Sequence, residues 1–300
     1  MSIETKGESK LFAAPMRNAS RRRQGCAERA QSILMPQRMQ RPKLGQHFLA
    51  SPTAQAAIAD ALGDVAQRTV VEIGPGRGAI TALMAARAQR LIAIELDRDL
   101  APRLRQQFAD RPSVEIVTQD ILAIDFSALR GNEGEKLLVV GNLPYYITSD
   151  ILLRLFRYHA IIDRAVIMIQ REVADRIAAH PGSSDYGILS ATTQMYACVE
   201  TLLTLPPTAF SPPPQVHSTV LRLTMAPRFE ELQVAPEEFL AFVRTCFAQK
   251  RKMLAKNLRN AGHDAAAIAA AFESCQISPQ ARAEEVDLEK IACVFRALPR

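Results

Sequence analysis

A four-residue segment, Asn142, Leu143, Pro144 and Tyr145, has groups that could hold a planar molecule carrying an amine or amide nitrogen. The lone pair of such a nitrogen is delocalised into the attached ring, so it is a poor nucleophile until hydrogen-bond acceptors draw its protons out of that geometry. The Asn142 side-chain carbonyl and the Pro144 backbone carbonyl could be these acceptors, and the Tyr145 ring could stack on the planar face. In an arbitrary protein the same residues would more often form only a strand-ending turn.

A glycine-rich turn lies upstream, at residues 74–78, where a first apolar run ends. Its spacing is G-x-G-x-G, unlike the G-x-G-x-x-G of dinucleotide-binding turns. Glu95 ends the next apolar run and could bind ribose hydroxyls. Asp120 follows the third run and could accept a hydrogen bond from an adenine amine, although a lone Asp there is more often a helix cap. Gly74, Glu95 and Asp120 together predict one crevice that binds a nucleoside cofactor.

The apolar runs alternate with helical patterns from residue 69 onward, which is the rhythm of β-α-β units and of a parallel sheet covered on both faces. The expected strands are Thr69–Ile73, Arg90–Ile94, Val114–Thr118, Leu137–Gly141 and Arg164–Ile169. The expected helices between them are Ala79–Ala86, Arg98–Phe108, Ser149–Phe156 and Arg171–Ala179. Ser51 as N-cap and Pro52 in the first turn predict a further helix before the first strand.

Two more β-rich stretches, Cys198–Leu205 and His217–Leu223, are separated by Phe210, Ser211 and the prolines 212–214, which must form a loop. After Pro227 the pattern is only helical. The expected helices are Pro236–Phe247, Lys250–Asn260, Ala265–Ser274 and Leu288–Ala297. We therefore expect three regions: a basic, disordered N-terminal extension (1–40), an α/β catalytic domain (41–227) and a small helical domain (228–300).

Positive charge is concentrated in two segments, although the whole chain carries a net +6. Residues 1–43 contain ten Lys or Arg and three Glu, and residues 44–300 contain 27 basic and 28 acidic residues. The first segment has too few apolar residues to fold. It could be an RNA-binding arm, an organellar presequence, or a stretch upstream of a true translation start at Met35 or Met39.

The second basic segment, residues 244–259, predicts RNA binding because it has six basic residues and no acidic one, although a solvated helix face is the usual alternative. These residues are Arg244, Lys250, Arg251, Lys252, Lys256 and Arg259.

The five cysteines are scattered and show no C-x-x-C spacing for zinc or redox chemistry, so we expect no metal. No apolar run approaches the ~18 residues of a membrane helix. A soluble, monomeric protein of the reducing cytoplasm is expected.

The segment at residues 142–145 resembles the loop that follows the fourth strand in adenine-N6 methyltransferases. By this resemblance the methyl donor is S-adenosylmethionine, whose positive sulfonium already activates the methyl group, so neither a metal nor a cysteine nucleophile is required. The target adenine would be flipped out of its strand and stacked on Tyr145.

Residues 43–297 as a whole resemble the ribosomal RNA small-subunit adenine dimethyltransferases, the KsgA family. Residues 43–49 are similar to the family's F-G-Q-N-F-L opening, with Leu44 and His47 where Phe and Asn are common. The resemblance implies a Rossmann-like methyltransferase fold, with a mostly parallel seven-stranded sheet and a small C-terminal all-α domain. It also implies that six residues contact the cofactor: His47, Leu49, Gly74, Glu95, Asp120 and Asn142.

Three further segments carry the same resemblance. Residues 210–218 match the family's proline loop, in which Phe210 would stack on the other face of the adenine, although a lone aromatic residue is more often core. Residues 170–176 match a segment beside the substrate cleft, although a helix with solvated charges explains each of its side chains equally well. Residues 247–258 match a ribosome-facing helix. The role of Tyr146, where many relatives have Asn, stays open.

The resemblance implies the transfer of two methyl groups to each of two adjacent adenosines, in the 3′-terminal hairpin loop of small-subunit (16S) ribosomal RNA. It also implies a role in late biogenesis of the small subunit. One rival function is a resistance methyltransferase that acts on an adenine of large-subunit ribosomal RNA, but its C-terminal domain differs. Another is a non-enzymatic assembly or transcription factor on the same fold, against which the intact Glu95, Asp120, Asn142 and Tyr145 argue.

Overall fold

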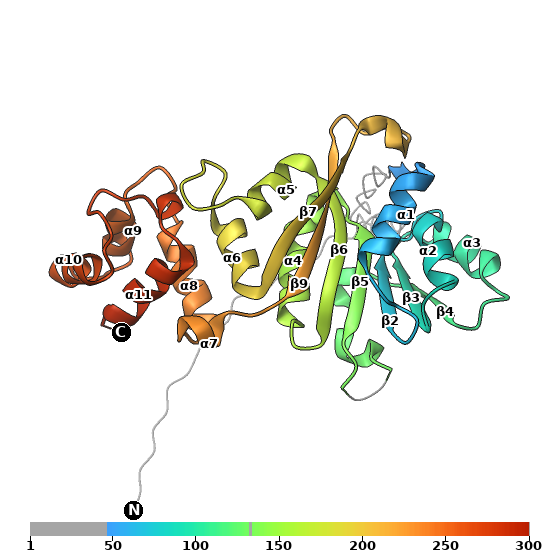
Figure 1. Ribbon diagram of the computed structural model, residues 1–300, viewed down its shortest axis with the longest axis horizontal. Helices are drawn as coiled ribbons and strands as arrows, with labels where there is room; N and C mark the ends of the chain where they lie inside the picture. Colours follow the sequence, from blue (N-terminus) through green and yellow to red (C-terminus); the bar gives the residue numbers. More distant parts are fainter. Residues whose placement is uncertain (1–46, 132–133, 300) are drawn as a thin grey trace, which may run out of the picture. The chain divides into compact units, whose positions relative to one another are not determined.

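A seven-stranded, mostly parallel sheet is the centre of the α/β part of the chain (Figure 1). The computed structural model describes residues 47–131 and 134–299. The strands, in spatial order, are β4 (Val114–Thr118), β3 (Arg90–Glu95), β2 (Thr69–Ile73), β5 (Leu137–Asn142), β6 (Ile162–Gln170), β9 (Ser218–Met225) and β7 (Ala197–Leu205). The first five are parallel, and β9 is antiparallel to both of its neighbours. The predicted fold class is confirmed.

The central strands are continuous apolar runs because both faces of the sheet are covered. Val70 and its counterparts on one face pack against α1 (Pro52–Ala61) and α2 (Ala79–Ala85). Val71 and its counterparts on the other face pack against α4 (Thr148–Arg157) and α5 (Arg171–Ala178). This period-2 alternation divides the interior into two apolar layers. A further helix, α3 (Leu100–Gln107), connects β3 to β4.

The helix α1 begins as predicted, with Ser51 as its N-cap and Pro52 in its first turn. The Ser51 hydroxyl accepts a hydrogen bond from the Ala54 backbone N–H at 3.4 Å. The segment just before this helix forms a short strand that was not predicted, β1 (Phe48–Leu49), which pairs antiparallel with β8 (Phe210–Ser211). This pairing ties the first described residues to the proline loop.

A group of helices follows the sheet: α7 (Phe229–Leu232), α8 (Pro236–Cys246), α9 (Leu254–Asn260), α10 (Ala265–Ser274) and α11 (Leu288–Ala297). They share one apolar core that also takes in Tyr186 and Met195, from the segment around α6 (Ile188–Tyr196). No pattern in the sequence predicted α6. The three-region division stays a prediction, and its N-terminal extension, like residues 43–46 of the family motif, lies outside the described residues.

The helix expected over residues 250–260 is wrong in its first part. The α9 helix begins only at Leu254, and residues 250–252 form a turn after α8. The Leu254 backbone N–H donates to the carbonyl of Ala281, and Met253 forms a bridge with Arg282. These long-range contacts, which no local pattern reveals, set the start of the helix.

One disulfide, between Cys275 and Cys293, joins the end of α10 to α11. It was not anticipated, because the sequence spacing of the two cysteines resembles no paired motif. Across residues 47–131 and 134–299, no helix has the length and apolar character to cross a membrane.

Candidate active site

The site lies where parallel strands end at the same edge of the sheet. Gly74, Glu95 and Asn142 come at the carboxyl ends of β2, β3 and β5, which are neighbours in the sheet. The Gly74 backbone N–H donates to the Ile94 carbonyl at 3.0 Å, and a Cβ atom on Gly74 would lie 3.5 Å from the Asn142 carbonyl oxygen. The structure therefore brings these three predicted residues together at one edge of the sheet.

The glycine turn is shaped so that only glycine fits without strain. Gly74 and Gly76 have φ of +67° and +59°, the left-handed region that side chains rarely adopt. A Cβ atom on Gly76 would lie 2.9 Å from the Phe48 ring. The Arg77 guanidinium covers the same ring at 4.3 Å from its centroid. The β1 strand thus sits directly on the turn.

Glu95 fastens the end of β3 to this turn. Its side chain is buried, and its two oxygens accept hydrogen bonds from the backbone N–H groups of Gly76 at 3.0 Å and Asp97 at 2.9 Å. Burial raises the pKa of the Glu95 carboxyl, and these two hydrogen bonds lower it. Each carboxylate oxygen has a second lone pair, so ribose hydroxyls can be added to these bonds.

A second acidic residue under the turn, Glu72, was not among the predicted site residues. It is 2% exposed, and its Oε2 atom has no hydrogen-bond partner among the described residues. Burial raises the pKa of Glu72 to about 7, and the charge of Glu95 adds to this effect. The signal that could have found it is an acidic residue inside an otherwise apolar strand, because such a group is costly to bury.

Asp120 is exposed and follows β4. Its carboxylate accepts from the Leu122 backbone N–H at 2.9 Å and caps the short 3-10 helix Ile121–Ala123. The capping role is the alternative that the sequence left open. A carboxylate that caps through one oxygen retains further acceptor capacity.

The Asn142 amide is held in place by the segment that contains His47. Its Nδ2 atom donates to the His47 carbonyl at 3.0 Å. His47 is itself bonded through Nδ1 to the Pro212 carbonyl at 2.8 Å, so β1 and the proline loop are joined here. Because the NH₂ end of the amide is engaged by His47, the carbonyl end is left to act as an acceptor. The Leu143 side chain is 1% exposed and belongs to the core.

The Pro144 carbonyl already accepts two hydrogen bonds, from the Ile147 backbone N–H and the Thr148 hydroxyl, both at 3.2 Å. The Tyr145 hydroxyl is 2.9 Å from the Ser218 hydroxyl at the start of β9, which fixes the tyrosine ring against the sheet. Tyr146, next in the chain, is 65% exposed.

Phe210 is 4% exposed and packs in the core layer that contains Leu49, with which it is paired across β1 and β8. This is the packing role that the sequence left as the alternative. A base could contact the ring only after β1 or the proline loop had moved. Stacking by Phe210 stays a prediction.

The six basic residues predicted to bind RNA are all exposed. They lie at the end of α8, in the turn at 250–252 and on α9, in the order Arg244, Lys250, Arg251, Lys252, Lys256 and Arg259. Lys250 also donates to the Ser184 carbonyl and lies 3.8 Å from Glu284, so it has a structural role as well.

Within the described ranges, no three His, Cys, Asp or Glu side chains are grouped so that they could hold a metal ion. The residues that do converge are a glycine turn, buried carboxylates, an oriented amide and a fixed tyrosine. This set can hold a nucleoside beside a second planar group and can accept hydrogen bonds from an amine.

Comparisons with known proteins agree on one family. The family model described as Ribosomal RNA adenine dimethylase matches residues 37–299. Two relatives called Ribosomal RNA small subunit methyltransferase A come from Acidobacterium capsulatum and Koribacter versatilis, at 61% and 53% identity. The alignments cover 86% and 85% of this chain, and 91% and 93% of those relatives.

Two solved structures have a similar fold. A dimethyladenosine transferase from Plasmodium falciparum aligns with a TM-score of 0.71 at 20% identity, over 83% of this chain and 96% of that one. The 23S rRNA methyltransferase ErmE aligns with a TM-score of 0.65 at 26% identity, over 84% and 100% of the two chains.

Proposed function

Since this chain belongs to the ribosomal RNA adenine dimethylase family, we propose that the crevice at Asn142 is its reaction centre, with S-adenosylmethionine on one side and a flipped adenine on the other. The protein is an S-adenosylmethionine-dependent methyltransferase. It transfers methyl groups to N6 of two adjacent adenosines in the 3′-terminal hairpin loop of 16S ribosomal RNA, which gives N6,N6-dimethyladenosine, and it takes part in late small-subunit biogenesis.

The residues present fit this cofactor. The glycine turn lets the backbone approach a ligand closely. We propose that Glu95 accepts hydrogen bonds from the ribose hydroxyls and that Asp120 accepts one from the adenine amine. We propose that the methionine part lies against His47, Leu49 and Asn142, a role supported by the hydrogen bond between Asn142 and the His47 carbonyl. When bound, S-adenosylmethionine supplies an electrophilic methyl group on a positively charged sulfur.

The single observation that carries the mechanism is the hydrogen bond from the Asn142 Nδ2 atom to the His47 carbonyl. This hydrogen bond orients the amide so that the Asn142 carbonyl oxygen is available as an acceptor. By accepting one proton of the target amine, this oxygen can draw the nitrogen lone pair out of conjugation with the ring. The Tyr145 ring, fixed through Ser218, supplies a face on which the flipped adenine can stack. Holding the amine in line with the donor then supplies much of the rate enhancement.

The Pro144 carbonyl is proposed as the second acceptor. It can take this role only if one of its present donors leaves it. A carbonyl oxygen has two lone pairs, and here Ile147 and Thr148 donate to it. The Thr148 hydroxyl also lies 3.4 Å from the Tyr145 carbonyl. We propose that, when the amine binds, the Thr148 hydroxyl donates its hydrogen bond to the Tyr145 carbonyl instead. One lone pair of the Pro144 carbonyl oxygen is then free to accept from the amine.

The exposed basic residues of α8, α9 and the turn between them are proposed to contact ribosomal RNA phosphates on the small subunit. We also propose that the protein is a monomer, that it acts in the cytoplasm, and that it needs no metal. The 61% identity to a small-subunit methyltransferase, against 26% to ErmE, favours the small subunit as substrate over the large one.

The test is methylation of purified small subunits that lack the modification, followed by mass spectrometry of their ribosomal RNA. Wild-type protein should produce N6,N6-dimethyladenosine. Asn142→Ala should lower the rate by about a hundredfold or more, the loss typical when a donor or acceptor at a reaction centre is removed. Asn142→Ala with an unchanged circular dichroism spectrum and unchanged product would overturn the mechanism. Labelling of large subunits alone would overturn the substrate.

A further inference from the structure

An open cavity of about 440 Å³ lies on the side of the reaction centre away from the glycine turn. One wall is the end of β6 and the start of α5, with Gln170, Arg171, Glu172 and Asp175. The other wall is the end of the proline loop, residues 215–217. The volume is within the range of small-molecule pockets, ~300–1,000 Å³.

This cavity is joined to the reaction centre through Ser218. The Ser218 hydroxyl is 2.9 Å from the Tyr145 hydroxyl, and Ser218 is paired with Gln170 across β6 and β9. The Arg171 backbone N–H donates to the His217 carbonyl at 3.0 Å, which closes the corner between the two walls. A group stacked on Tyr145 and a group in the cavity would therefore be near neighbours.

The chemistry of the lining favours a base over a phosphate. Two carboxylates, Glu172 and Asp175, and one guanidinium, Arg171, face a cavity that also has two amides and an imidazole. Arg171 and Arg176 are already paired with these two carboxylates, so the lining offers a phosphate no surplus positive charge, whereas the carboxylates can accept hydrogen bonds from the exocyclic amine of a base. Val216, which is 42% exposed, adds an apolar contact for the ring of such a base.

The two carboxylates can change partners at little cost. Arg171 lies 3.5 Å from Asp175, and Arg176 is paired with Glu172; both pairs span one turn of α5 and are exposed. Exposed ion pairs of this kind contribute little to stability. A base amine can therefore take over a carboxylate without disturbing the fold.

We propose that this cavity is a second base-binding site, which holds the unpaired adenine next to the target adenine during methylation. The inference rests on the proposed function, because it needs a substrate with two adjacent adenosines. Glu172 and Asp175 accept hydrogen bonds from N6 of the neighbour, and Val216 contacts its ring. The neighbour thereby positions the target against Asn142 and Tyr145.

The proposal has a chemical consequence for the second half of the reaction. An N6,N6-dimethyladenine has no N–H on its exocyclic nitrogen and cannot donate to a carboxylate. Once one adenosine is finished, it binds the cavity poorly, and methylation of the other is slower. The wild-type protein should therefore show two phases, and a protein without the carboxylates should lose the faster one.

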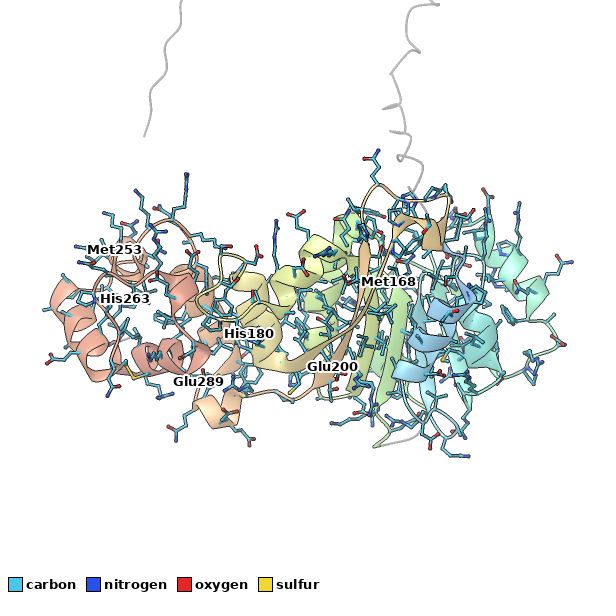
Figure 2. The ribbon with its side chains drawn as sticks, turned by 45° about the horizontal axis from the view of Figure 1, so that its top comes forward. Met168, His180, Glu200, Met253, His263 and Glu289 are labelled. Atoms are coloured by element: carbon cyan, nitrogen blue, oxygen red, sulfur yellow. A yellow bond between two sulfur atoms is a disulfide. The ribbon has the colours of Figure 1, made fainter. Side chains whose placement is uncertain are left out.

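The first experiment compares matched variants in time courses on unmethylated small subunits, with saturating S-adenosylmethionine. Glu172→Ala and Asp175→Ala should each slow the first phase, and together they should slow it by about tenfold or more, the size expected when hydrogen bonds to charged acceptors are lost. Alanine is used because glutamine or asparagine would keep a carbonyl that can accept from the amine. Glu200→Ala is the control, because Glu200 on β7 (Figure 2) is also an exposed carboxylate paired with an arginine, Arg222 at 2.6 Å, and is not part of the cavity lining. It should leave both phases unchanged.

The second experiment changes the RNA and leaves the protein alone, so it does not depend on the folding of a variant. Small subunits are reconstituted with purine riboside, which lacks the N6 amine, in place of one of the two adenosines. Wild-type protein should methylate the remaining adenosine about tenfold more slowly, and the double variant should show no further loss on this substrate.

The outcomes separate the two proposals. A wild-type protein that makes no dimethyladenosine on small subunits sinks the proposed function. Normal wild-type activity, together with a double variant or a purine riboside neighbour that leaves the rate unchanged, sinks only the second base-binding site. Losses from the variant and from the missing amine that multiply would show that the carboxylates act on something other than the neighbouring base.

Discussion

The two ends of the Asn142 amide have different tasks at the scale of single residues. The nitrogen end is engaged by the His47 carbonyl, and His47 is bonded to the proline loop at Pro212. A reaction centre that is held within a fraction of an ångström needs such supporting contacts. The side chain that accepts from the target amine is therefore positioned by a segment far away in the sequence.

Glu72 is a buried carboxyl whose charge state affects stability. Its pKa is raised to about 7 by burial, whereas a carboxyl in the unfolded chain titrates near the ordinary value of 4.5. The folded protein therefore binds the proton more tightly than the unfolded chain. Stability contributed by this proton is fully present below pH 4.5, falls as the pH rises to about 7, and is absent above it.

Glu72→Gln should remove this pH dependence. The amide is neutral at every pH, so above pH 7 the variant should be more stable than wild type by about 3 kcal/mol, from ~1.4 kcal/mol per pKa unit. Urea unfolding of both proteins between pH 5 and pH 8 measures the difference. Two stability curves that run parallel over this interval would contradict a raised pKa at Glu72.

At the scale of elements, the contact between the glycine turn and Phe48 of β1 holds β1 against the proposed cofactor site. Gly76 has φ of +59°, and a Cβ atom there would lie 2.9 Å from the Phe48 ring. Gly76→Ala should therefore combine backbone strain, ~1–2 kcal/mol, with displacement of β1. We expect a lower melting temperature and at least tenfold weaker S-adenosylmethionine binding by calorimetry.

Gly182→Ala is the matched control for that variant. Gly182 has φ of +90°, and a Cβ atom there would meet no atom within 4 Å. Alanine at this φ is at least as strained as at +59°, so the control includes the backbone penalty without the contact. If both variants bind S-adenosylmethionine as wild type does, the contact between Phe48 and the turn has no part in the cofactor site.

The sequence predicted the ends of the sheet strands to within two residues, because most of these strands are continuous apolar runs that end at glycine or polar residues. It missed β1 and β8, which are two residues long and exist only because they pair with each other. It also extended a helix over residues 250–253, because basic residues are good helix formers. The sequence also did not establish that Phe210 and Glu72 are buried, because their burial depends on neighbours that are distant in the sequence.

At the scale of the whole molecule, the predicted RNA-binding residues lie in a different part of the chain from the proposed reaction centre. The site residues predicted at the strand ends are carboxylates, an amide and aromatic rings, whereas the six exposed basic residues of segment 244–259 lie on α8, α9 and the turn between them. These basic residues can attract ribosomal RNA phosphates even though the proposed reaction centre is acidic. Binding and methylation should therefore respond to different substitutions.

Arg251→Ala combined with Lys252→Ala tests this separation, with Lys250 left in place because it contacts Ser184 and Glu284. The variant should bind small subunits more weakly, and the slope of log affinity against log salt should fall by roughly 0.7–1 for each lost phosphate contact. Affinity for S-adenosylmethionine should stay at the wild-type value.

Arg103→Ala combined with Arg111→Ala removes the same charge from two exposed arginines at α3 and the turn that follows it, away from the helical group. Filter binding across a salt series should give this control the wild-type slope if RNA is recognised by a local patch. Equal losses in the two pairs would instead mean that net charge alone attracts the RNA, and the turn at residues 250–252 would then have no specific place on the ribosome.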